Sequence, residues 1–320
     1  MVKYIIKRLV LMLFTFFVIV MISFILIRML PRELPTDKNL AAVIQARWEA
    51  LGYNEPIIVQ FGIYLKNIFT AWDFGTSWKI SQLTPAAELL SSRMLPTVLV
   101  NVYSLIVSVP LGIALGVFAA IKKNKWPDQV ISILVMIFVS VPSYVYAFLV
   151  QYFFYSLTGI IKTPVMYSLA DAGGSYFSWK MFTSMIPAIV SLSFGEIAGL
   201  CRFTRAELTE TLTQDYMLLA RTKGLTRGQA TRRHALKNAM VPILPSIIGS
   251  FIGILGGSMV IEQIFAIPGV GQLYIQSIQQ LDYDVFMLDT VFYTFIGLLA
   301  NILVDISYGF IDPRIRMGEK

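Results

Sequence analysis

The side chains that could do chemistry are concentrated between residues 201 and 240, where eight basic residues accompany His234, the only histidine. The sequence has no Gly-x-x-x-x-Gly-Lys-Ser/Thr loop, which would cradle nucleotide phosphates. It has no residues at metal-ligand spacing and no evident nucleophile–base pair. We therefore expect no catalytic, metal-binding or cofactor-binding residue, and we interpret this stretch as a docking surface. Its basic residues are Arg202, Arg205, Arg221, Lys223, Arg227, Arg232, Arg233 and Lys237.

This stretch is predicted to form two helices joined by a turn. The first helix spans Arg205–Lys223, and Gly224 ends it because glycine readily adopts a left-handed conformation. The second helix runs from Thr226 to about Ala239, and Gln229 completes a capping box at its start. A rigid helical turn transmits the movement of a partner, whereas a flexible linker would absorb it. Apolar residues at helical spacing in the first helix are Leu208, Leu212, Tyr216 and Leu219.

The composition is that of a membrane protein. The chain is 56% hydrophobic and 14% charged, whereas a soluble domain carries about 25% charged residues. Six apolar runs approach the ~20 residues that a helix needs to cross a bilayer, so we predict an all-α integral membrane protein with six transmembrane helices. Cys201 is the only cysteine, which excludes an intrachain disulfide. The predicted spans are Leu9–Ile27, Val98–Ile121, Val130–Tyr155, Ser184–Leu200, Val241–Ile261 and Val285–Ile306.

The basic residues predict the orientation of the spans. Lys122, Lys123 and Lys125 lie between the second and third spans, and the eight basic residues above lie between the fourth and fifth. The short loop at 262–284 has none. By the positive-inside rule, both termini and residues 201–240 are cytosolic. The same rule accounts for the net charge of +7 and the pI near 9.4, so we expect no nucleic-acid partner.

The chain is predicted to have three parts: residues 1–30 with the first span, an external loop at 31–95, and a five-helix core at 96–320 that includes 201–240. The external loop has apolar residues at helical spacing over Leu40–Leu51 and Ile57–Phe69. It is either a small cap on the membrane surface or a platform for an external partner. Prolines interrupt the second and third spans at Pro110 and Pro142, where neighbouring helices can satisfy the freed carbonyls.

The 201–240 stretch resembles the coupling segment of binding-protein-dependent ABC importer permeases, and most closely that of the B-type permease of oligopeptide and dipeptide transporters. That family has acidic-Tyr-x-x-x-Ala-Arg-x-Lys-Gly-Leu, then Arg-His-Ala-Leu-x-Asn-Ala and a proline. The matching residues are Asp215, Tyr216, Ala220, Arg221, Lys223, Gly224, Leu225, Arg233, His234, Ala235, Leu236, Asn238, Ala239 and Pro242. The general importer pattern starts with Glu-Ala-Ala, and here Leu218 and Leu219 replace the first two residues.

The resemblance extends over nearly the whole chain. It includes the opening Tyr4–Leu9, the external segment at Pro56–Phe61, the end of the fifth span at Gly256–Glu262, the Pro268–Gly271 turn and the closing Asp312–Arg316. Each piece is short, but their order and spacing match the family. The external loop and residues 158–183 fit least well.

The resemblance implies a permease subunit of an ATP-driven oligopeptide importer in a prokaryotic cytoplasmic membrane. It implies a second homologous permease, two ATPase subunits and an extracytoplasmic peptide-binding protein as partners. ATP and magnesium are expected in the ATPase subunits, with no cofactor in this chain. The expected ATPase-coupling residues are Asp215, Tyr216, Ala220, Arg221, Lys223, Gly224, Leu225, His234 and Asn238. The alternative for this basic segment is a patch that contacts anionic membrane lipid.

Two acidic residues near the external ends of spans are candidates for a substrate path. Glu262 and Asp289 lie at or within apolar runs, where acidic side chains are costly and usually face water or a partner charge. They would meet the amine of a peptide or simply face water at the interface.

Other functions stay open from the sequence. The same machine would serve for dipeptides or for a nickel chelate. An integral membrane enzyme would need a convergent set of catalytic groups near a membrane face, and none is evident. A channel that works without an ATPase would not need a rigid basic segment between its fourth and fifth spans.

Overall fold

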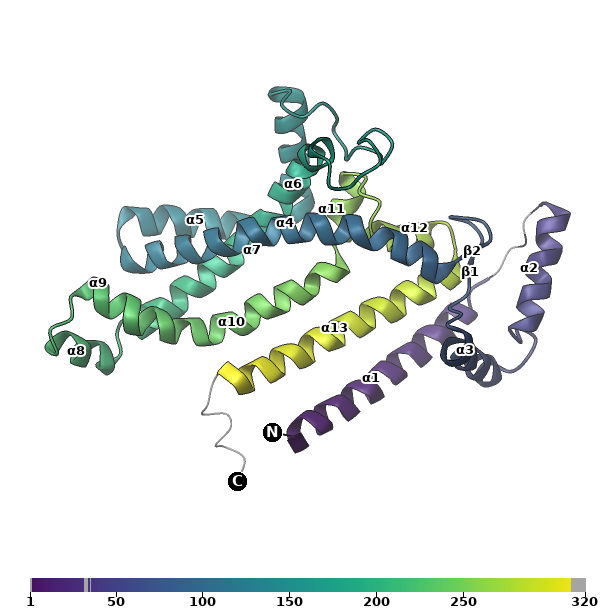
Figure 1. Ribbon diagram of the computed structural model, residues 1–320, viewed down its shortest axis with the longest axis horizontal. Helices are drawn as coiled ribbons and strands as arrows, with labels where there is room; N and C mark the ends of the chain where they lie inside the picture. Colours follow the sequence, from purple (N-terminus) through teal and green to yellow (C-terminus); the bar gives the residue numbers. More distant parts are fainter. Residues whose placement is uncertain (1, 32–33, 35, 312–320) are drawn as a thin grey trace. The chain divides into compact units, whose positions relative to one another are not determined.

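The computed structural model describes residues 2–31, 34 and 36–311, and most of them are helical. The closing Asp312–Arg316 segment therefore lies outside the described residues. Figure 1 shows the elements in chain order. They are α1 (Val2–Arg28), α2 (Lys38–Ala50), α3 (Ile57–Ala71), β1 (Thr76–Ser77), β2 (Thr84–Pro85), α4 (Ala86–Ile121), α5 (Trp126–Ser140), α6 (Ser143–Tyr152), the π-helix η1 (Phe153–Leu157), α7 (Trp179–Thr211), α8 (Asp215–Thr222), α9 (Arg227–Ala230), the π-helix η2 (Thr231–Ala235), α10 (Leu236–Gly253), the 3-10 helix η3 (Ile254–Gly256), α11 (Met259–Ile264), α12 (Val270–Gln279) and α13 (Tyr283–Ile311).

Five helices of the described chain are long and apolar enough to cross a membrane, and a bent pair supplies a sixth candidate. The five are Ile5–Arg28, Ala86–Ile121, Trp179–Thr211, Arg227–Gly256 and Tyr283–Tyr308. This confirms a helical membrane protein with up to six spans. All five helices extend past at least one predicted boundary, because polar turns continue the helix beyond its apolar run. The fifth, Arg227–Gly256, nevertheless ends before the predicted Ile261, where Gly257 leaves the helical conformation with φ +62°.

The third predicted span, Val130–Tyr155, is wrong as a single helix. It consists of α5 and α6 with η1, which are bent by 105° relative to each other. Val141 is extended, with φ −81° and ψ 128°, and Pro142 caps the next helix. The proline ring disfavours helical geometry at the residue before it, so the helix ends there. Pro110, by contrast, lies inside α4, and its predicted tolerance is confirmed.

The chain divides into two compact units, which we describe separately. The first comprises Leu95–Gln272 and the chain from Leu299. Its centre is α7, which packs against α5, α6 and α10 (Figure 1). Its largest buried cluster gathers Val100, Met181, Met185, Ile261 and Phe265.

Two glycines allow α4 to approach α7 closely. A Cβ at Gly112 would lie 2.8 Å from the Leu200 Cβ, and one at Gly116 would lie 2.7 Å from the Cys201 carbonyl oxygen. Gly112 and Gly116 form a Gly-x-x-x-Gly pair, the motif that brings membrane helices into contact because lipid supplies little hydrophobic drive between them. The Gly112–Gly116 spacing is visible in the sequence, but no helix contact was predicted from it.

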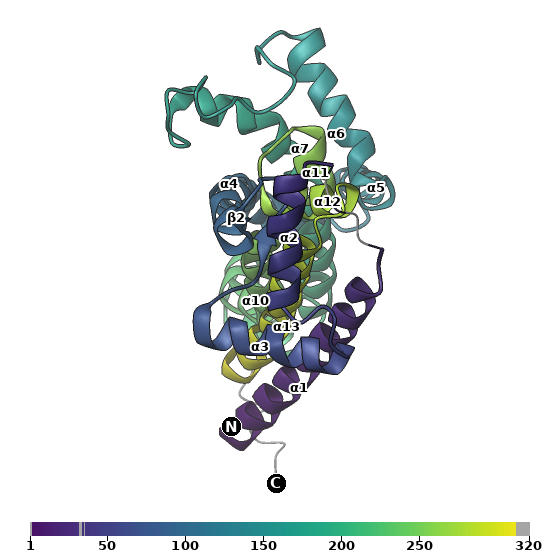
Figure 2. The ribbon, with the colours of Figure 1, turned by 90° about the vertical axis from the view of Figure 1, so that its right-hand side faces the viewer.

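The second unit comprises Val2–Met94 and Leu273–Leu298. The helices predicted near Leu40–Leu51 and Ile57–Phe69 are confirmed as α2 and α3, which run in different directions (Figure 2). Their external location stays a prediction. α3 packs against α1, and the buried side chains there include Phe24, Phe61 and Met287. The β1–β2 pair is antiparallel, with Thr76 opposite Pro85 and Ser77 opposite Thr84.

Candidate functional site

The predicted helix Arg205–Lys223 is wrong as a continuous helix. α7 ends at Thr211, Gln214 is extended, and α8 begins at Asp215. The hydroxyls of Thr211 and Thr213 donate to the Leu208 and Glu210 carbonyls at 3.1 and 2.8 Å, and such local bonds compete with helix continuation. We call residues 212–240 the coupling hairpin.

The break changes which side chains of the first helix face inward. Met217 and Ala220 are buried, whereas Leu219 is 55% exposed. The predicted helical spacing that joined Leu219 to Leu208, Leu212 and Tyr216 is therefore wrong, because it assumed unbroken helical phase across residues 212–214.

The turn after α8 is a tight, glycine-dependent cap. Gly224 has φ +90°. The Leu225 N–H donates to the Ala220 carbonyl at 3.3 Å, and the Gly224 N–H donates to the Arg221 carbonyl at 3.0 Å. These two bonds form a Schellman motif, which favours glycine at the left-handed position. The predicted stop at Gly224 is confirmed.

The start of the second helix is also confirmed. The Thr226 hydroxyl accepts from the Gln229 N–H at 3.3 Å, and the Gln229 Oε1 accepts from the Thr226 N–H at 3.0 Å, which is the reciprocal capping box. Contrary to the expected end near Ala239, the helix continues through η2 into α10, so one helical stretch covers Arg227–Gly256. The hairpin and a predicted span therefore belong to one helical stretch.

A small apolar core fixes the coupling hairpin in place. Met217 and Ala220 of α8 pack with Ala230, and Ala120 of α4 and Leu208 of α7 belong to the same buried cluster. The hairpin is therefore a packed part of the helical bundle and not a free loop. Small side chains in α9, η2 and α10 let the helices approach closely, and this is why Ala235 and Ala239 are fully buried.

The structure divides the predicted coupling residues into two groups. Ala220 is buried, and Tyr216 and Leu225 are half-buried against the hairpin core. The remaining six are exposed, namely Asp215, Arg221, Lys223, Gly224, His234 and Asn238. Within the described chain, the side chains of Arg221, Lys223 and His234 have no hydrogen-bond or ion-pair partner.

Two exposed leucines complete this surface, and the predicted site omitted them. Leu218 is 66% exposed and Leu219 is 55% exposed. Leu218 also lines a groove with Arg221 and Arg227. Their only signal in the sequence was their position, since they replace polar or small residues of the general importer pattern. An apolar pair ringed by charge is suited to a protein partner.

Glu262 is 2% exposed. Its Oε1 accepts from the Thr97 hydroxyl at 2.8 Å, and its Oε2 accepts from the Gln272 N–H at 2.9 Å. Thr97 in turn accepts from the Val270 N–H at 2.9 Å. Burial raises the pKa of the Glu262 carboxyl above its ordinary value, and the hydrogen bonds from Gln272 and Thr97 oppose that shift. We call Thr97, Glu262 and residues 268–272 the carboxylate turn.

Glycines make room for this carboxylate. A Cβ at Gly269 would lie 2.6 Å from the Glu262 Cδ, and one at Gly271 would lie 3.0 Å from the Glu262 Oε2. Gly257 also borders the carboxylate and has φ +62°. Gly257, Gly269 and Gly271 of the Gly256–Glu262 and Pro268–Gly271 motifs are therefore needed because a Cβ at these positions would collide with the buried Glu262 carboxylate.

Asp289 lies in α13 of the second unit and is fully buried. Neither of its carboxylate oxygens has a hydrogen-bond partner among the described residues. Asp282, which precedes α13, instead accepts from the Ser77 hydroxyl at 2.6 Å and from three successive N–H groups at Trp78–Ile80. A substrate-path role for Glu262 and Asp289 stays a prediction.

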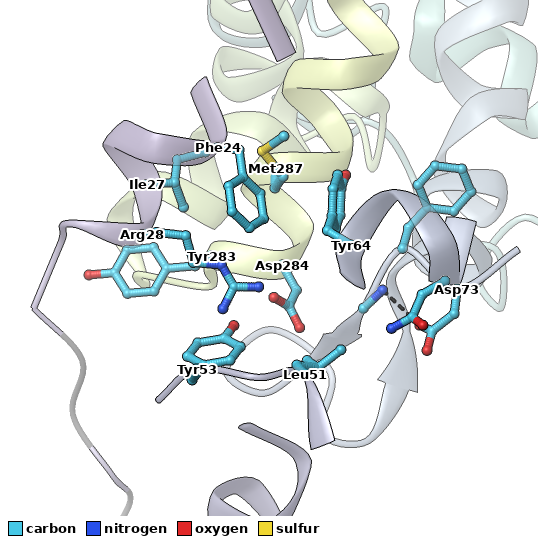
Figure 3. A pocket seen from close by; sticks show the side chains of 13 residues that line it. Phe24, Ile27, Arg28, Leu51, Tyr53, Tyr64, Asp73, Tyr283, Asp284 and Met287 are labelled. Carbon is cyan, nitrogen blue, oxygen red and sulfur yellow. Dashed lines mark hydrogen bonds between the residues drawn. The ribbon is translucent and has the colours of Figure 1, made fainter. Parts of the chain in front are cut away.

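A pocket lies within the second unit and encloses about 450 Å³ including its open side. In Figure 3 the Arg28 guanidinium points toward Asp284, and Tyr53 and Tyr64 border the same space. Arg28 lies 3.6 Å from the Tyr53 ring centre, and burial raises the pKa of the Tyr64 hydroxyl. Asp73, which lines the pocket, also pairs with Arg47 of α2. These contacts tie α2 and α3 to the ends of α1 and α13.

Comparisons with known proteins identify the chain's relatives. A family model described as binding-protein-dependent transport system inner membrane component matches residues 112–317, and the N-terminal model of that system matches residues 1–109. The dipeptide transport system permease protein DppB of Lactococcus lactis subsp. cremoris (strain MG1363) is 34% identical, over 99% of this chain and 100% of the relative. DppB of Bacillus subtilis (strain 168) is 34% identical over all of both chains.

A third relative is the glutathione transport system permease protein GsiC of Escherichia coli (strain K12), which is 32% identical over 99% of each chain. The inward-facing structure of the MetNI methionine ABC transporter matches 73% of this chain and 98% of its own, with 19% identity and a TM-score of 0.51. The last comparison shows a shared fold. The chain is a multi-pass protein of the cytoplasmic membrane and belongs to the binding-protein-dependent transport system inner membrane components, the permease family of ABC importers.

Proposed function

We propose that this chain is the B-type permease of an ATP-driven peptide importer, and that its coupling hairpin receives the ATPase subunits. The observation that carries the proposal is the two-sided construction of the hairpin. One side is an apolar core shared with α4 and α7, and the other exposes Arg221 and Lys223 beside Leu218.

The hairpin is suited to transmit force. Because Arg227–Gly256 is one helical stretch, displacement of the exposed surface moves a predicted span without passing through a linker. Shifting a two-state balance from 1:99 to 99:1 takes roughly 5.5 kcal/mol of differential binding. In this proposal nucleotide binding in the partner ATPases supplies that difference, and ATP and magnesium bind there.

The proposed cargo is a peptide. The dipeptide and glutathione systems named above transport short peptides, and their permeases align with nearly the whole of this chain. We propose a second homologous permease as the other half of the path, and an extracytoplasmic binding protein as the source of peptide. Dipeptides fit this proposal as well as oligopeptides do, and a nickel chelate is the remaining alternative.

The test reverses charge on the exposed side of the hairpin. The double variant Arg221→Glu with Lys223→Glu should lose ATP-driven uptake of a labelled di- or oligopeptide in proteoliposomes that hold the full importer. Both side chains are exposed, so the variant should insert and co-purify with its second permease as the wild type does.

The matched control is Lys123→Glu with Lys125→Glu, the same charge change on two exposed lysines in the turn between α4 and α5. It should retain uptake. Unchanged uptake in the hairpin variant would refute ATPase docking at this surface and would favour a channel that works without an ATPase. Uptake of a nickel chelate in place of peptide would keep the docking proposal and overturn the cargo.

A further inference from the structure

A groove runs along the contact between α5 and α7, within the first unit. It encloses about 820 Å³ including its open side. Its walls are mostly apolar, from Ile131, Val135 and Val139 on α5 and from Cys201 and Ala206 on α7. In Figure 1 these two helices run side by side.

The length of the groove matches one leaflet of a membrane. Its α5 wall extends from Ile131 to Ser140, a rise of about 15 Å at 1.5 Å per residue. That is half of the ~30 Å hydrocarbon core. The wall stops at the Val141–Pro142 break, where α6 turns away by 105°. The groove is therefore long enough for one acyl chain.

The other end of the groove carries positive charge. Arg205 binds Asp128 through two contacts, Nε to Oδ1 at 2.5 Å and Nη2 to Oδ2 at 2.8 Å, so its charge is balanced. Arg202 lines the same groove, is exposed, and has no partner among the described side chains. The Asn124 N–H also donates to Asp128 at 2.8 Å, which places the lysine-rich turn at 122–125 at this end.

We propose that the α5–α7 groove binds one anionic glycerophospholipid of the adjoining leaflet. Its acyl chain lies along Val135 and Val139 of α5, and its phosphate contacts Arg202, one turn of α7 away from Ala206 and the Arg205–Asp128 pair. The apolar wall alone would accept any lipid, and the unbalanced Arg202 favours a negative headgroup. The bound lipid would support the bent span beside α7.

The test uses the full importer complex in vesicles that contain phosphatidylglycerol with a photoreactive acyl chain. Mass spectrometry of the cross-linked peptides should place the label on 131–140 of α5. The same probe attached to phosphatidylcholine should label this stretch about fivefold less, the factor expected for one basic residue beside an anionic lipid. Arg202→Gln should reduce the phosphatidylglycerol label by about the same factor.

Two further variants make the result decisive. Lys162→Gln removes an exposed charge that does not line the groove and should leave the label unchanged, whereas Ala206→Trp should block it by filling the groove beside Arg205. Equal labelling by both lipids, insensitive to Arg202→Gln, would overturn the proposal because it indicates ordinary lipid contact. Absence of label with loss of the second permease in Ala206→Trp would also overturn it, since the groove would then be a subunit interface.

Discussion

The coupling hairpin and the carboxylate turn use ionisable side chains in opposite ways. The hairpin exposes Arg221, Lys223 and His234 and buries alanines beneath them. The carboxylate turn buries Glu262 at 2% exposure and surrounds it with hydrogen-bond donors and glycines.

This difference separates stability from partner binding. Removing a buried, bonded carboxylate leaves its donors unsatisfied and costs folding free energy. Removing an exposed charge costs little folding free energy and instead alters what the surface can bind. We therefore expect substitutions in the carboxylate turn to reduce folded protein, and substitutions on the hairpin surface to reduce transport by folded protein.

The largest effect is expected from adding one methyl group beside Glu262. Gly269→Ala should destabilise the protein by about 2–4 kcal/mol, because its Cβ would lie 2.6 Å from the Glu262 Cδ. Folded yield in detergent and the thermal midpoint measure this loss. Gly228→Ala is the matched control in the hairpin, since no atom lies within 4 Å of its Cβ. Equal stability of the two variants would contradict the comparison.

A smaller loss is expected when Glu262 itself is removed. Glu262→Ala leaves the Thr97 hydroxyl and the Gln272 N–H without their acceptor, at a cost of about 1–3 kcal/mol. Asp215→Ala, which removes an exposed carboxylate from the first turn of α8, should cost less than about 1 kcal/mol. Thermal unfolding of both variants in one detergent tests this. A wild-type midpoint for Glu262→Ala would show that the carboxylate serves something other than this turn.

Exchange of the exposed leucines should act on activity alone. Leu218→Ser with Leu219→Ser should lower transport-coupled ATP hydrolysis by about tenfold, because apolar anchors dominate protein interfaces, with an unchanged thermal midpoint. Met217→Ser, one position earlier but buried, should instead lower the midpoint. If the leucine variant hydrolyses ATP normally in the assembled importer, the docking surface does not include these residues.

The smallest effect is expected at the cap of α9. Thr226→Ala removes one half of the capping box and should cost about 1 kcal/mol, while Thr226→Ser should restore most of it. Hydrogen exchange at residues 227–230 is the measurement, because the loss is local. Exchange that is identical in Thr226→Ala and wild type would mean that packing of Ala230 alone holds the turn.

Local signals carried most of the correct predictions. Gly224 and the Thr226–Gln229 pair act within a few residues, so their cap motifs follow from sequence spacing. The spans and the helices of the external loop follow from apolar runs and periodicity. The errors at residues 212–214 and at Val141–Pro142 lie at short breaks within apolar or helical runs. There the hydroxyl bonds of Thr211 and Thr213, or the ring of Pro142, outweigh continuation of the helix.

The substrate-path candidates show a second limit of prediction from the sequence. Sequence placed Glu262 and Asp289 together in one class as acids in apolar surroundings. Only the structure distinguishes them: Glu262 meets Thr97 and Gln272, whereas both oxygens of Asp289 lack a hydrogen-bond partner among the described residues. Thr97 lies 165 residues before Glu262 in the chain, a contact that no local pattern reports.

A helical membrane protein, its family motif and the caps of its hairpin follow from the amino-acid sequence alone, because apolar run length and capping depend on neighbouring residues. Only the folded chain shows which hairpin side chains face outward, and that Thr97 and the glycines enclose Glu262. Each of those depends on contacts between segments far apart in the chain, where close packing leaves no room for a misplaced Cβ or an unpaired charge.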